Sequence, residues 1–305
     1  MTLVCETPAR RVIFDDPPLV SVIIPVFNDP QRLRACLERL EAQTYPRWRY
    51  EVIVVDNGST PPIHLNGMRQ VRVLYEPRPG SYHARNTGIA AATGEVLAFT
   101  DSDCVPAPDW IERGVARLID EPNCGMVAGR VDVFVKDDAG PTAVELHEQL
   151  TAFQQRRYIE DHHYGATANV FTFRDVIRRV GPFNVKLKSS GDNEWGNRVF
   201  AAGYRQLYAD DVRVAHPARR SLGEIYRKVR RLAGGQKDWK GEGSFTWRAM
   251  FCDLRPPVGL IVRTLRDPRL PGLARKAKFI GVEVFIRYTR ALERTRLHLG
   301  AAARR

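Results

Sequence analysis

The feature that most constrains this chain is the order of its first hundred residues, where short apolar runs alternate with segments of helical character. The runs are rich in Val and Ile and have the length of buried strands. They begin at Val20, Glu51, Val71 and Glu95. Helices are predicted between them, one that starts at Pro30 after an Asp29 cap and one over residues 81–92. Strands that alternate with helices predict an α/β fold, with a mostly parallel sheet that carries helices on both faces.

Two carboxylates emerge together where the last of these strands ends. Asp101 and Asp103 follow the apolar run 96–99, and residues two apart in extended backbone point to the same side. Neighbouring anions repel, and a divalent cation with oxygen ligands relieves that repulsion while keeping positions open for a substrate diphosphate. The alternative is a solvated Asp-rich turn, because D-x-D alone is common in loops.

Loops with polar residues also follow the first two predicted strands, at Phe27-Asn28 and at Asp56-Asn57. In open parallel sheets, ligands bind beyond the carboxyl ends of the strands. These two loops and the loop that holds Asp101 and Asp103 are therefore expected to converge on one crevice.

The motifs at these positions, taken in order, resemble those of family 2 glycosyltransferases. They are P-x-F-N ending at Asn28, V-V-D-N-G-S-T ending at Thr60, A-R-N-x-G-I starting at Ala84 and F-T-D-S-D-C ending at Cys104, with further matches at residues 180–183, 190–198, 203–204 and 214–219. The ordered set is far more specific than any single motif. The resemblance covers the first two-thirds to three-quarters of the chain. It implies a GT-A fold, a nucleotide-sugar donor, a divalent metal and inversion at the anomeric carbon.

The resemblance also implies which residues bind the metal and the diphosphate. Asp103 is the first choice for a Mn²⁺ or Mg²⁺ ligand and His216 the second, with a structural histidine bonded to backbone as the alternative for His216. Asp101 is expected to contact the ribose or the base, and Ser102 lies beside it in the same motif. Arg219 is expected to reach phosphate oxygens, with a solvated charge as its alternative.

Asp192 is the predicted catalytic base. The family motif has an acidic pair ahead of a helix, a further acid two places later and an Arg four beyond that. This chain keeps Asp192, Glu194 and Arg198 but has Gly191 in place of the first acid. The alternative for Asp192 is a simple helix cap. Glu194 is the alternative base.

The nucleotide is expected to lie over the first two loops. On the resemblance, Pro25, Phe27 and Asn28 shape a base pocket, and Asp56 accepts a hydrogen bond from the base, which a uracil imide N–H allows. Arg85 is expected to pack over the base or to meet phosphate, with an ion pair to Asp56 or Asp101 as its alternative. The predicted donor is a UDP-sugar or dTDP-sugar. The donor sugar, the acceptor linkage and the oligomeric state are left open.

Charge is divided unevenly along the chain. Residues 255–305 hold thirteen Lys or Arg against three Asp or Glu, whereas the whole chain has a net charge of +12. We therefore predict a GT-A catalytic domain over residues 1–220 and a basic helical extension over residues 221–305. Basic amphipathic helices often lie on anionic membranes, so an anionic membrane surface is a predicted partner, beside the nucleotide-sugar donor and an acceptor on a surface glycan, a lipopolysaccharide or a lipid-linked intermediate. The alternative is that these helices pack their apolar stripes on the domain.

The basic segment and the fold are also compatible with two other functional classes. Nucleic-acid binding is not expected, because the Arg-rich helices lack regular aromatic interleaving and any recognisable reading module. A catalytically weak interaction protein on a transferase fold is disfavoured by the intact acidic motifs.

Location is predicted from the cysteines and from hydropathy. The five cysteines form no C-x-x-C pair, which is typical of reduced thiols in the cytosol. They are Cys5, Cys36, Cys104, Cys124 and Cys252. No uninterrupted apolar run approaches the roughly 18 residues of a membrane span. The protein is therefore predicted to be cytoplasmic and peripheral on the inner face of the cell membrane.

Overall fold

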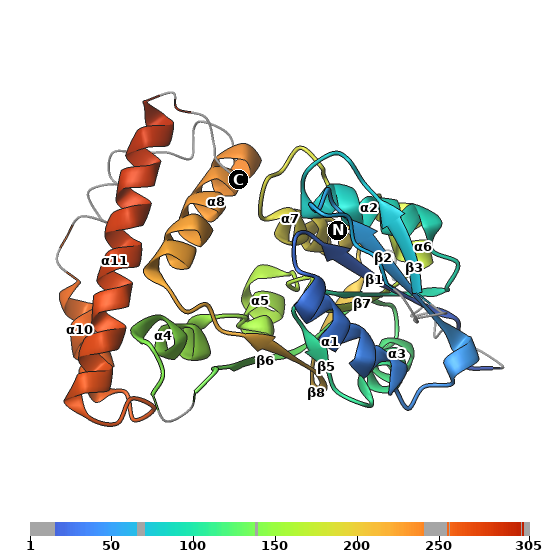
Figure 1. Ribbon diagram of the computed structural model, residues 1–305, viewed down its shortest axis with the longest axis horizontal. Coiled ribbons are helices and arrows are strands. Elements are labelled where there is room, and N and C mark those ends of the chain that lie inside the picture. Colours follow the sequence, from blue (N-terminus) through green and yellow to red (C-terminus); the bar gives the residue numbers. More distant parts are fainter. Residues whose placement is uncertain are drawn as a thin grey trace, which may run out of the picture. The chain divides into compact units, whose positions relative to one another are not determined.

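The structure is a computed structural model that describes residues 16–65, 71–137, 140–240, 255, 257–299 and 301 (Figure 1). Cys5 and Cys252 lie outside the described residues. The other three cysteines are buried free thiols.

One eight-stranded sheet organises the fold, in the order β3-β2-β1-β4-β7-β6-β8-β5. Its strands are β1 Val20–Val26, β2 Tyr50–Asp56, β3 Val71–Tyr75, β4 Val96–Thr100, β5 Val105–Pro106, β6 Cys124–Phe134, β7 Asn169–Phe173 and β8 Arg205–Pro217. The pairs β3-β2, β2-β1 and β1-β4 are parallel. From β4 onward, the pairs β4-β7, β7-β6 and β8-β5 are antiparallel. The predicted strand-helix alternation therefore corresponds to the parallel half of the sheet.

Helices connect these strands and continue to the C-terminal part of the chain. They are α1 Pro30–Glu41, α2 Ser81–Ala91, α3 Trp110–Asp120, α4 Ala143–Thr151, α5 Gln155–His162, α6 Arg174–Val180, α7 Gly191–Ala201, α8 Leu222–Lys240, α10 Val258–Arg266 and α11 Leu273–His298. Asp29 caps α1 as predicted, since its carboxylate accepts from the Arg32 amide at 3.3 Å.

Helices cover both faces of the sheet. A Cβ on Gly88 of α2 would lie 2.5 Å from Cγ2 of Ile23 on β1, so α2 approaches that strand closely. Gly114 of α3 lies in the same way against the ring of Phe171 on β7. Ile23 pairs in register with Phe99, and Phe99 pairs with Val170. Successive strand residues alternate between faces, so Phe171 and α3 lie on the face opposite Ile23 and α2.

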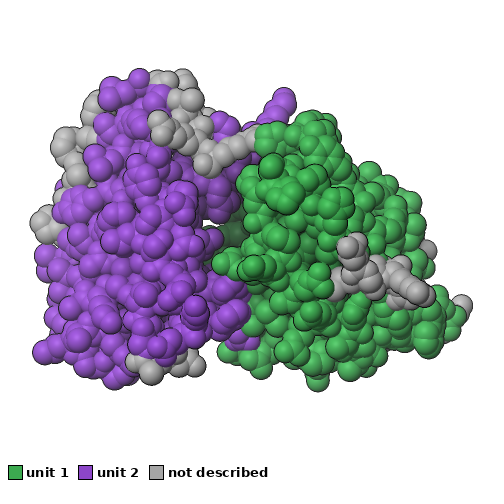
Figure 2. Space-filling view, in the orientation of Figure 1, with its two compact units in different colours: residues 1–131, 154–184, 192–215 green, residues 132–153, 185–191, 216–305 purple. Residues whose placement is uncertain are grey.

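The chain divides into two compact units (Figure 2). Unit 1 comprises residues 1–131, 154–184 and 192–215, and unit 2 comprises residues 132–153, 185–191 and 216–305. Unit 1 holds the parallel half of the sheet and most of the residues predicted for the site. The functional division at residue 220 stays a prediction.

Unit 2 is built around α11, which packs with α4, α8 and α10. One apolar cluster joins Val144 of α4 to Ile225 and Val229 of α8 and to Val282 of α11, with Phe285 packed against it. A second cluster joins Leu146 of α4 to Leu270 and Phe279. The apolar residues of the basic C-terminal helices thus contribute to the core of unit 2. Within the described residues, no helix combines the length and hydropathy needed to cross a membrane.

Candidate active site

Hydrogen bonds join the loops that follow β1 and β2. The amide of Asn28 donates to Oγ of Ser59 at 2.8 Å, and Oδ1 of Asn28 accepts from the Thr60 amide at 2.8 Å. Asn28 has a φ of 52°, in the left-handed region that Asn tolerates better than most residues. The Asn57 amide also donates to the carbonyl of Val26 at 2.9 Å. The first two predicted loops therefore meet, as expected from a parallel sheet.

Asn57 extends the same network to the loop between β3 and α2. Its side-chain Nδ2 donates to the carbonyls of Glu76 and Arg78 at 2.9 and 2.8 Å, and its Oδ1 accepts from the Gly80 backbone amide at 2.7 Å. Gly80 is the N-cap of α2. The β2 loop therefore fixes the start of the helix that carries Arg85.

Glu76 is the buried anion of this loop. Its carboxylate accepts from Nε of Arg78 at 2.8 Å, from the Arg78 amide at 2.9 Å and from the Thr87 hydroxyl at 2.6 Å. The bonds from Arg78 lower the pKa of Glu76 to about 2, although burial acts in the opposite direction. The carboxylate is thus ionised across the physiological range and holds the loop to α2.

Asp56 lies at the end of β2 and is buried. Its two carboxylate oxygens accept from the amides of Ser59 at 2.9 Å and Ile63 at 3.0 Å. Asp56 therefore shapes its own loop, and its predicted contact with the base stays a prediction. Pro25 lies within β1, opposite Val55 of β2. The Phe27 side chain is 62% exposed, which leaves a ring face open beside these loops.

An ion pair fixes the first carboxylate of the D-x-D motif. Nη2 of Arg85, whose side chain is only 5% exposed, lies 2.5 Å from Oδ1 of Asp101. The ion-pair alternative for Arg85 is thus confirmed. Nε of Arg85 is buried and has no hydrogen-bond partner within the described residues. A buried N–H without an acceptor is costly. This N–H can therefore donate a hydrogen bond to a ligand oxygen or an ordered water.

The second carboxylate is partly buried and lies within ion-pair range of a different arginine. Oδ2 of Asp103 is 3.8 Å from Nη1 of Arg32, and the Asp103 side chain is 24% exposed. Ser102, between the two aspartates, is buried. Burial first, and then the charges of Asp103 and Asp101, raise the pKa of the Cys36 thiol well above its ordinary range. Cys36 is therefore a protonated packing residue beside the two anions.

No cluster of three or more His, Cys, Asp or Glu side chains suited to a metal occurs within the described residues. A hard cation in a phosphate-transfer site needs fewer protein ligands, because Mg²⁺ is usually bound by one or two carboxylates together with substrate phosphates. The oxygen-only pair of Asp101 and Asp103 fits a cation of that kind.

Asp192 lies in the first turn of α7. Its Oδ1 accepts from the Asn193 amide at 3.0 Å, so it takes part in local bonding at the helix start. Tyr164 lies nearby: burial raises the pKa of its phenol, and the charges of Tyr158 and Asp192 add to the effect. Tyr158 and Tyr164 stack with centroids 4.8 Å apart. Asp192 is thus bordered by an aromatic pair.

Glu194 has a different environment. Its carboxylate accepts from Nε and Nη2 of Arg198 at 2.8 and 3.2 Å. The same guanidinium donates to the carbonyl of Pro182 at 2.6 Å, so the pair holds the turn after α6 against α7. Trp195 is buried and donates to the Gly181 carbonyl at 3.1 Å, which favours packing over acceptor stacking for this ring.

Two predicted residues belong to unit 2. His216 is buried, its Nδ1 lies 2.8 Å from the carbonyl of Pro217, and its ring lies 4.6 Å from that of Phe153. Nη1 of Arg219 donates to Glu148 at 2.7 Å, and Nζ of Lys228 donates to the other oxygen of that carboxylate at 2.6 Å. Burial raises the pKa of Glu148, but the two cations more than offset it, so that pKa lies below its ordinary value. Arg219 is therefore paired and not a solvated charge.

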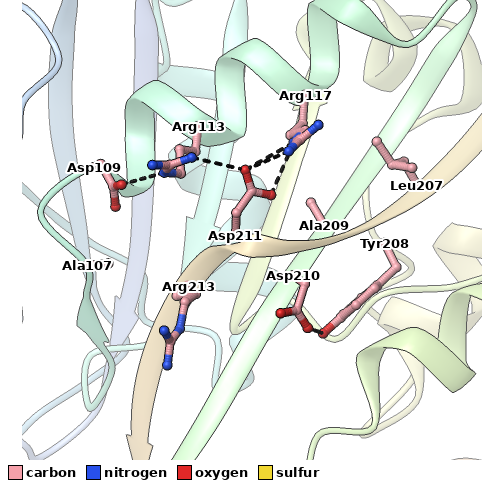
Figure 3. Close-up of a pocket in the computed structure, with 10 residues that line it drawn as sticks. All are labelled: Ala107, Asp109, Arg113, Arg117, Leu207, Tyr208, Ala209, Asp210, Asp211 and Arg213. Carbon is pink, nitrogen blue, oxygen red and sulfur yellow. Dashed lines mark hydrogen bonds and ion pairs between the residues drawn. The ribbon is translucent and has the colours of Figure 1, made fainter.

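An open cavity of about 740 Å³ lies in unit 1, between α3 and β8. Figure 3 shows Arg113 and Arg117 of α3 both reaching Asp211 of β8. Tyr208 donates to Asp210 at 2.8 Å on the same strand. None of the predicted site residues lines this cavity. Arg113 and Arg117 already share Asp211 as a carboxylate partner, so the strand-end loops remain the better candidate for the site.

Comparison with known proteins identifies the family of this chain. The family model of glycosyl transferase family 2 matches residues 21–181. Glycosyltransferase AglE of Haloferax volcanii is 38% identical over 231 residues, which is 72% of this chain and 73% of that protein. The pre-mycofactocin glycosyltransferase of Mycobacterium tuberculosis is 32% identical over 220 residues, which is 69% of this chain and 45% of that protein.

Among solved structures, the mannosyltransferase PcManGT from Pyrobaculum calidifontis, in complex with GDP-Man and Mn²⁺, has a TM-score of 0.54 and 18% identity, and the match covers 95% of this chain and 77% of that one. GalNAc-T7 with UDP, GalNAc and Mn²⁺ has a TM-score of 0.51 and 19% identity, over 72% and 48% of the two chains. These likenesses show a GT-A fold. The chain belongs to glycosyl transferase family 2, and it is a glycosyltransferase.

Sequence reasoning missed Glu76 and did not assign a supporting role to Asn57 or Arg198. Glu76 and Asn57 fix the start of α2, and Arg198 fixes α7. One signal was available, because Glu194 and Arg198 are spaced four apart on a predicted helix. Nothing in the sequence marks Glu76 as buried, since acidic residues are mostly exposed.

Proposed function

We propose that the protein is a metal-dependent inverting glycosyltransferase that moves a sugar from a UDP-sugar or dTDP-sugar to a hydroxyl acceptor. The observation that carries this proposal is the hydrogen-bonded junction of the strand-end loops at Asn28 and Asn57, beside the Arg85–Asp101 ion pair. This junction lies at the carboxyl edge of the parallel strands, where such sheets bind ligands. The D-x-D carboxylates leave the same edge.

Asp103 is the proposed protein ligand of a Mn²⁺ or Mg²⁺ ion. Asp101 is paired with the buried Arg85 at 2.5 Å, whereas Asp103 lies 3.8 Å from the exposed Arg32. His216 stays the second predicted ligand. With Nδ1 protonated and donating to the Pro217 carbonyl, its Nε2 would carry the lone pair, an arrangement common among metal-binding histidines. When bound, the metal supplies Lewis-acid stabilisation of charge on the leaving diphosphate.

Other cations and polar groups are proposed to bind the donor. Arg85 and Arg219 would each offer a remaining guanidinium N–H to phosphate oxygens, since Arg has several donors. Asp101 and Ser102 would contact the ribose. Asp101 is partly buried and Ser102 is buried, so packing holds both side chains in fixed positions.

The base pocket is proposed to lie over the first two loops. Pro25, Phe27 and Asn28 would line it, with the exposed Phe27 ring as a stacking surface. Asp56 would accept from an imide N–H of the base, because each carboxylate oxygen has a second lone pair beyond the one used by the loop amides.

Asp192 is the proposed general base. It would take the proton of the acceptor hydroxyl as that oxygen bonds to the anomeric carbon and the bond to the diphosphate oxygen breaks. Glu194 is the poorer candidate, because its two oxygens are held by Arg198 and removing the pair would release the turn after α6.

The acceptor is proposed to be a surface glycan, a lipopolysaccharide or a lipid-linked intermediate, with the protein cytoplasmic and peripheral on an anionic membrane. Exposed arginines on α8, α10 and α11 support this, since basic residues near an anionic surface each contribute about 1 kcal/mol.

A donor-hydrolysis screen tests the proposal. Purified protein is assayed for release of nucleoside diphosphate from UDP-, dTDP- and GDP-sugars with Mn²⁺ and with chelator. Asp103→Asn is expected to remove most metal-dependent turnover, whereas Asp161→Asn, at an exposed position of α5, should leave it unchanged. Turnover that persists in chelator or in Asp103→Asn would overturn the metal role. A product that retains the donor's anomeric configuration would exclude direct displacement, and no turnover with any donor would favour an interaction protein.

A further inference from the structure

One side of helix α10 is covered by its own unit, and another side carries exposed apolar residues. Thr264 is buried on the side where α10 packs against α11. Val258, Val262 and Leu265 are spaced at i, i+4 and i+7, so they share the other face. Their exposed fractions are 62%, 41% and 46%. An aliphatic stripe along this helix is therefore open to its surroundings.

The stripe continues at the tip of the hairpin formed by α10 and α11. Leu273, the first residue of α11, is 78% exposed, whereas Leu270 in the connecting turn is buried. Nζ of Lys276 donates to the carbonyl of Leu265 at the end of α10. This bond joins the last turn of one helix to the first turn of the other. Leu273 and Leu265 therefore belong to the same end of the hairpin.

Basic side chains accompany the stripe. Arg255, Arg263 and Arg266 are exposed, and residues 258–266 contain no acidic residue. Nε of Arg263 donates to the Gly259 carbonyl at 3.2 Å. A backbone carbonyl has no net charge, so this bond does not neutralise the guanidinium. At the tip, Asp267 pairs with Arg269 at 2.7 Å. The surroundings of the stripe thus keep an excess of positive charge.

We propose that this face of α10, with Leu273, is the surface by which the protein docks on an anionic lipid bilayer. An aliphatic face beside exposed arginines is the composition of helices that lie in the headgroup region of such bilayers. A second copy is a poorer occupant, because a twofold interface brings each patch against itself and would place arginines against arginines. The inference rests on the membrane association proposed above, and it names the residues that make the contact.

The test compares variants of the full chain for co-sedimentation with vesicles, either pure phosphatidylcholine or phosphatidylcholine with phosphatidylglycerol. The unsubstituted protein should bind the acidic vesicles and be released by salt, because screening weakens the attraction. Leu265→Asp is expected to lower binding at least about tenfold, since a charge then enters the inserted face. Leu292→Asp is the matched control, because Leu292 is 71% exposed on α11 away from this stripe, and it should bind normally.

A second variant, which removes basic charge, is used in case Leu265→Asp disturbs folding. The double variant Arg263→Gln/Arg266→Gln should lower binding roughly 25-fold, at about fivefold for each basic residue. Arg227→Gln, at an exposed position of α8, should have a smaller effect. Binding to acidic vesicles that is unaffected by both stripe variants would overturn this inference and leave the membrane proposal standing. No vesicle binding by the unsubstituted protein would overturn both, without bearing on donor hydrolysis. A dimer that Leu265→Asp dissociates would assign the stripe to self-association instead.

Discussion

Replacing Glu76 with Gln should destabilise unit 1 and disturb the site from a distance. Glu76 is buried and receives bonds from Arg78 and Thr87, while Asn57 bonds to the Glu76 carbonyl and to the cap of α2. Gln is nearly isosteric, but it removes the negative charge and places an N–H₂ group near the guanidinium of Arg78. The main loss is therefore the charge-assisted part of these bonds.

The size of the loss follows from the pKa. A carboxyl group whose pKa falls from 4.5 in the unfolded chain to about 2 in the fold stabilises the fold by about 3 kcal/mol at neutral pH. Arg78 is 67% exposed, and solvent screening of this partner reduces the figure to about 2 kcal/mol. Because the folded pKa is depressed, this stability is present above about pH 4.5 and is lost as the pH falls toward 2.

Urea unfolding followed by circular dichroism, at several pH values from 7 down to 3.5, measures this contribution. The difference in unfolding free energy between the parent protein and Glu76→Gln should be about 2 kcal/mol at pH 7 and should shrink as Glu76 protonates. The kcat/KM for the donor should also fall, because the cap of α2 positions Arg85. A difference below about 0.5 kcal/mol, or one that does not change with pH, would refute the reasoning.

Four further substitutions test other parts of the structure. Asp192→Asn should lower kcat at least about a hundredfold with donor affinity unchanged, measured by turnover and by titration calorimetry, whereas Glu194→Gln should mainly lower the melting temperature. Gly114→Ala should cost about 1–3 kcal/mol in urea unfolding, because its Cβ would overlap the Phe171 ring; a neutral result would mean that α3 shifts freely. Glu148→Gln should cost about 2–3 kcal/mol, because it leaves two cations without their buried partner, and an unchanged urea midpoint would contradict this.

The parallel half of the sheet could be predicted because its strands are buried on both faces. Such strands appear as unbroken apolar runs, and β1, β2 and β4 have that form. Strand β6, Cys124–Phe134, was not predicted. It contains Gly125, Gly129 and the exposed Arg130, and glycine inside a strand weakens the sequence signal. Its extended conformation depends on tertiary pairing with β7, which the local sequence does not specify.

The acidic residues of the candidate site could be predicted from the sequence, whereas most of the residues that hold them in place could not. Asp101, Asp103 and Asp192 stand in motifs, so they were found by resemblance and by their position after strands or at a helix start. The partner of each acid depends on contacts that motifs alone do not describe. Arg85 reaches Asp101 from another element, so the local sequence around Asp101 does not specify that contact, whereas the i, i+4 spacing of Glu194 and Arg198 does indicate theirs.

The basic C-terminal segment shows why a charge count alone does not locate a surface. Two buried carboxylates, Glu148 and Glu293, each bind two basic side chains within unit 2, so those cations serve the fold rather than a partner. Helix α10 differs, because it has no acidic residue and exposes both its arginines and an aliphatic stripe. Desolvating an already paired arginine at a membrane would first require breaking its pair. The attraction to an anionic surface should therefore concentrate on α10, although the sequence spreads basic residues over α8, α10 and α11 alike.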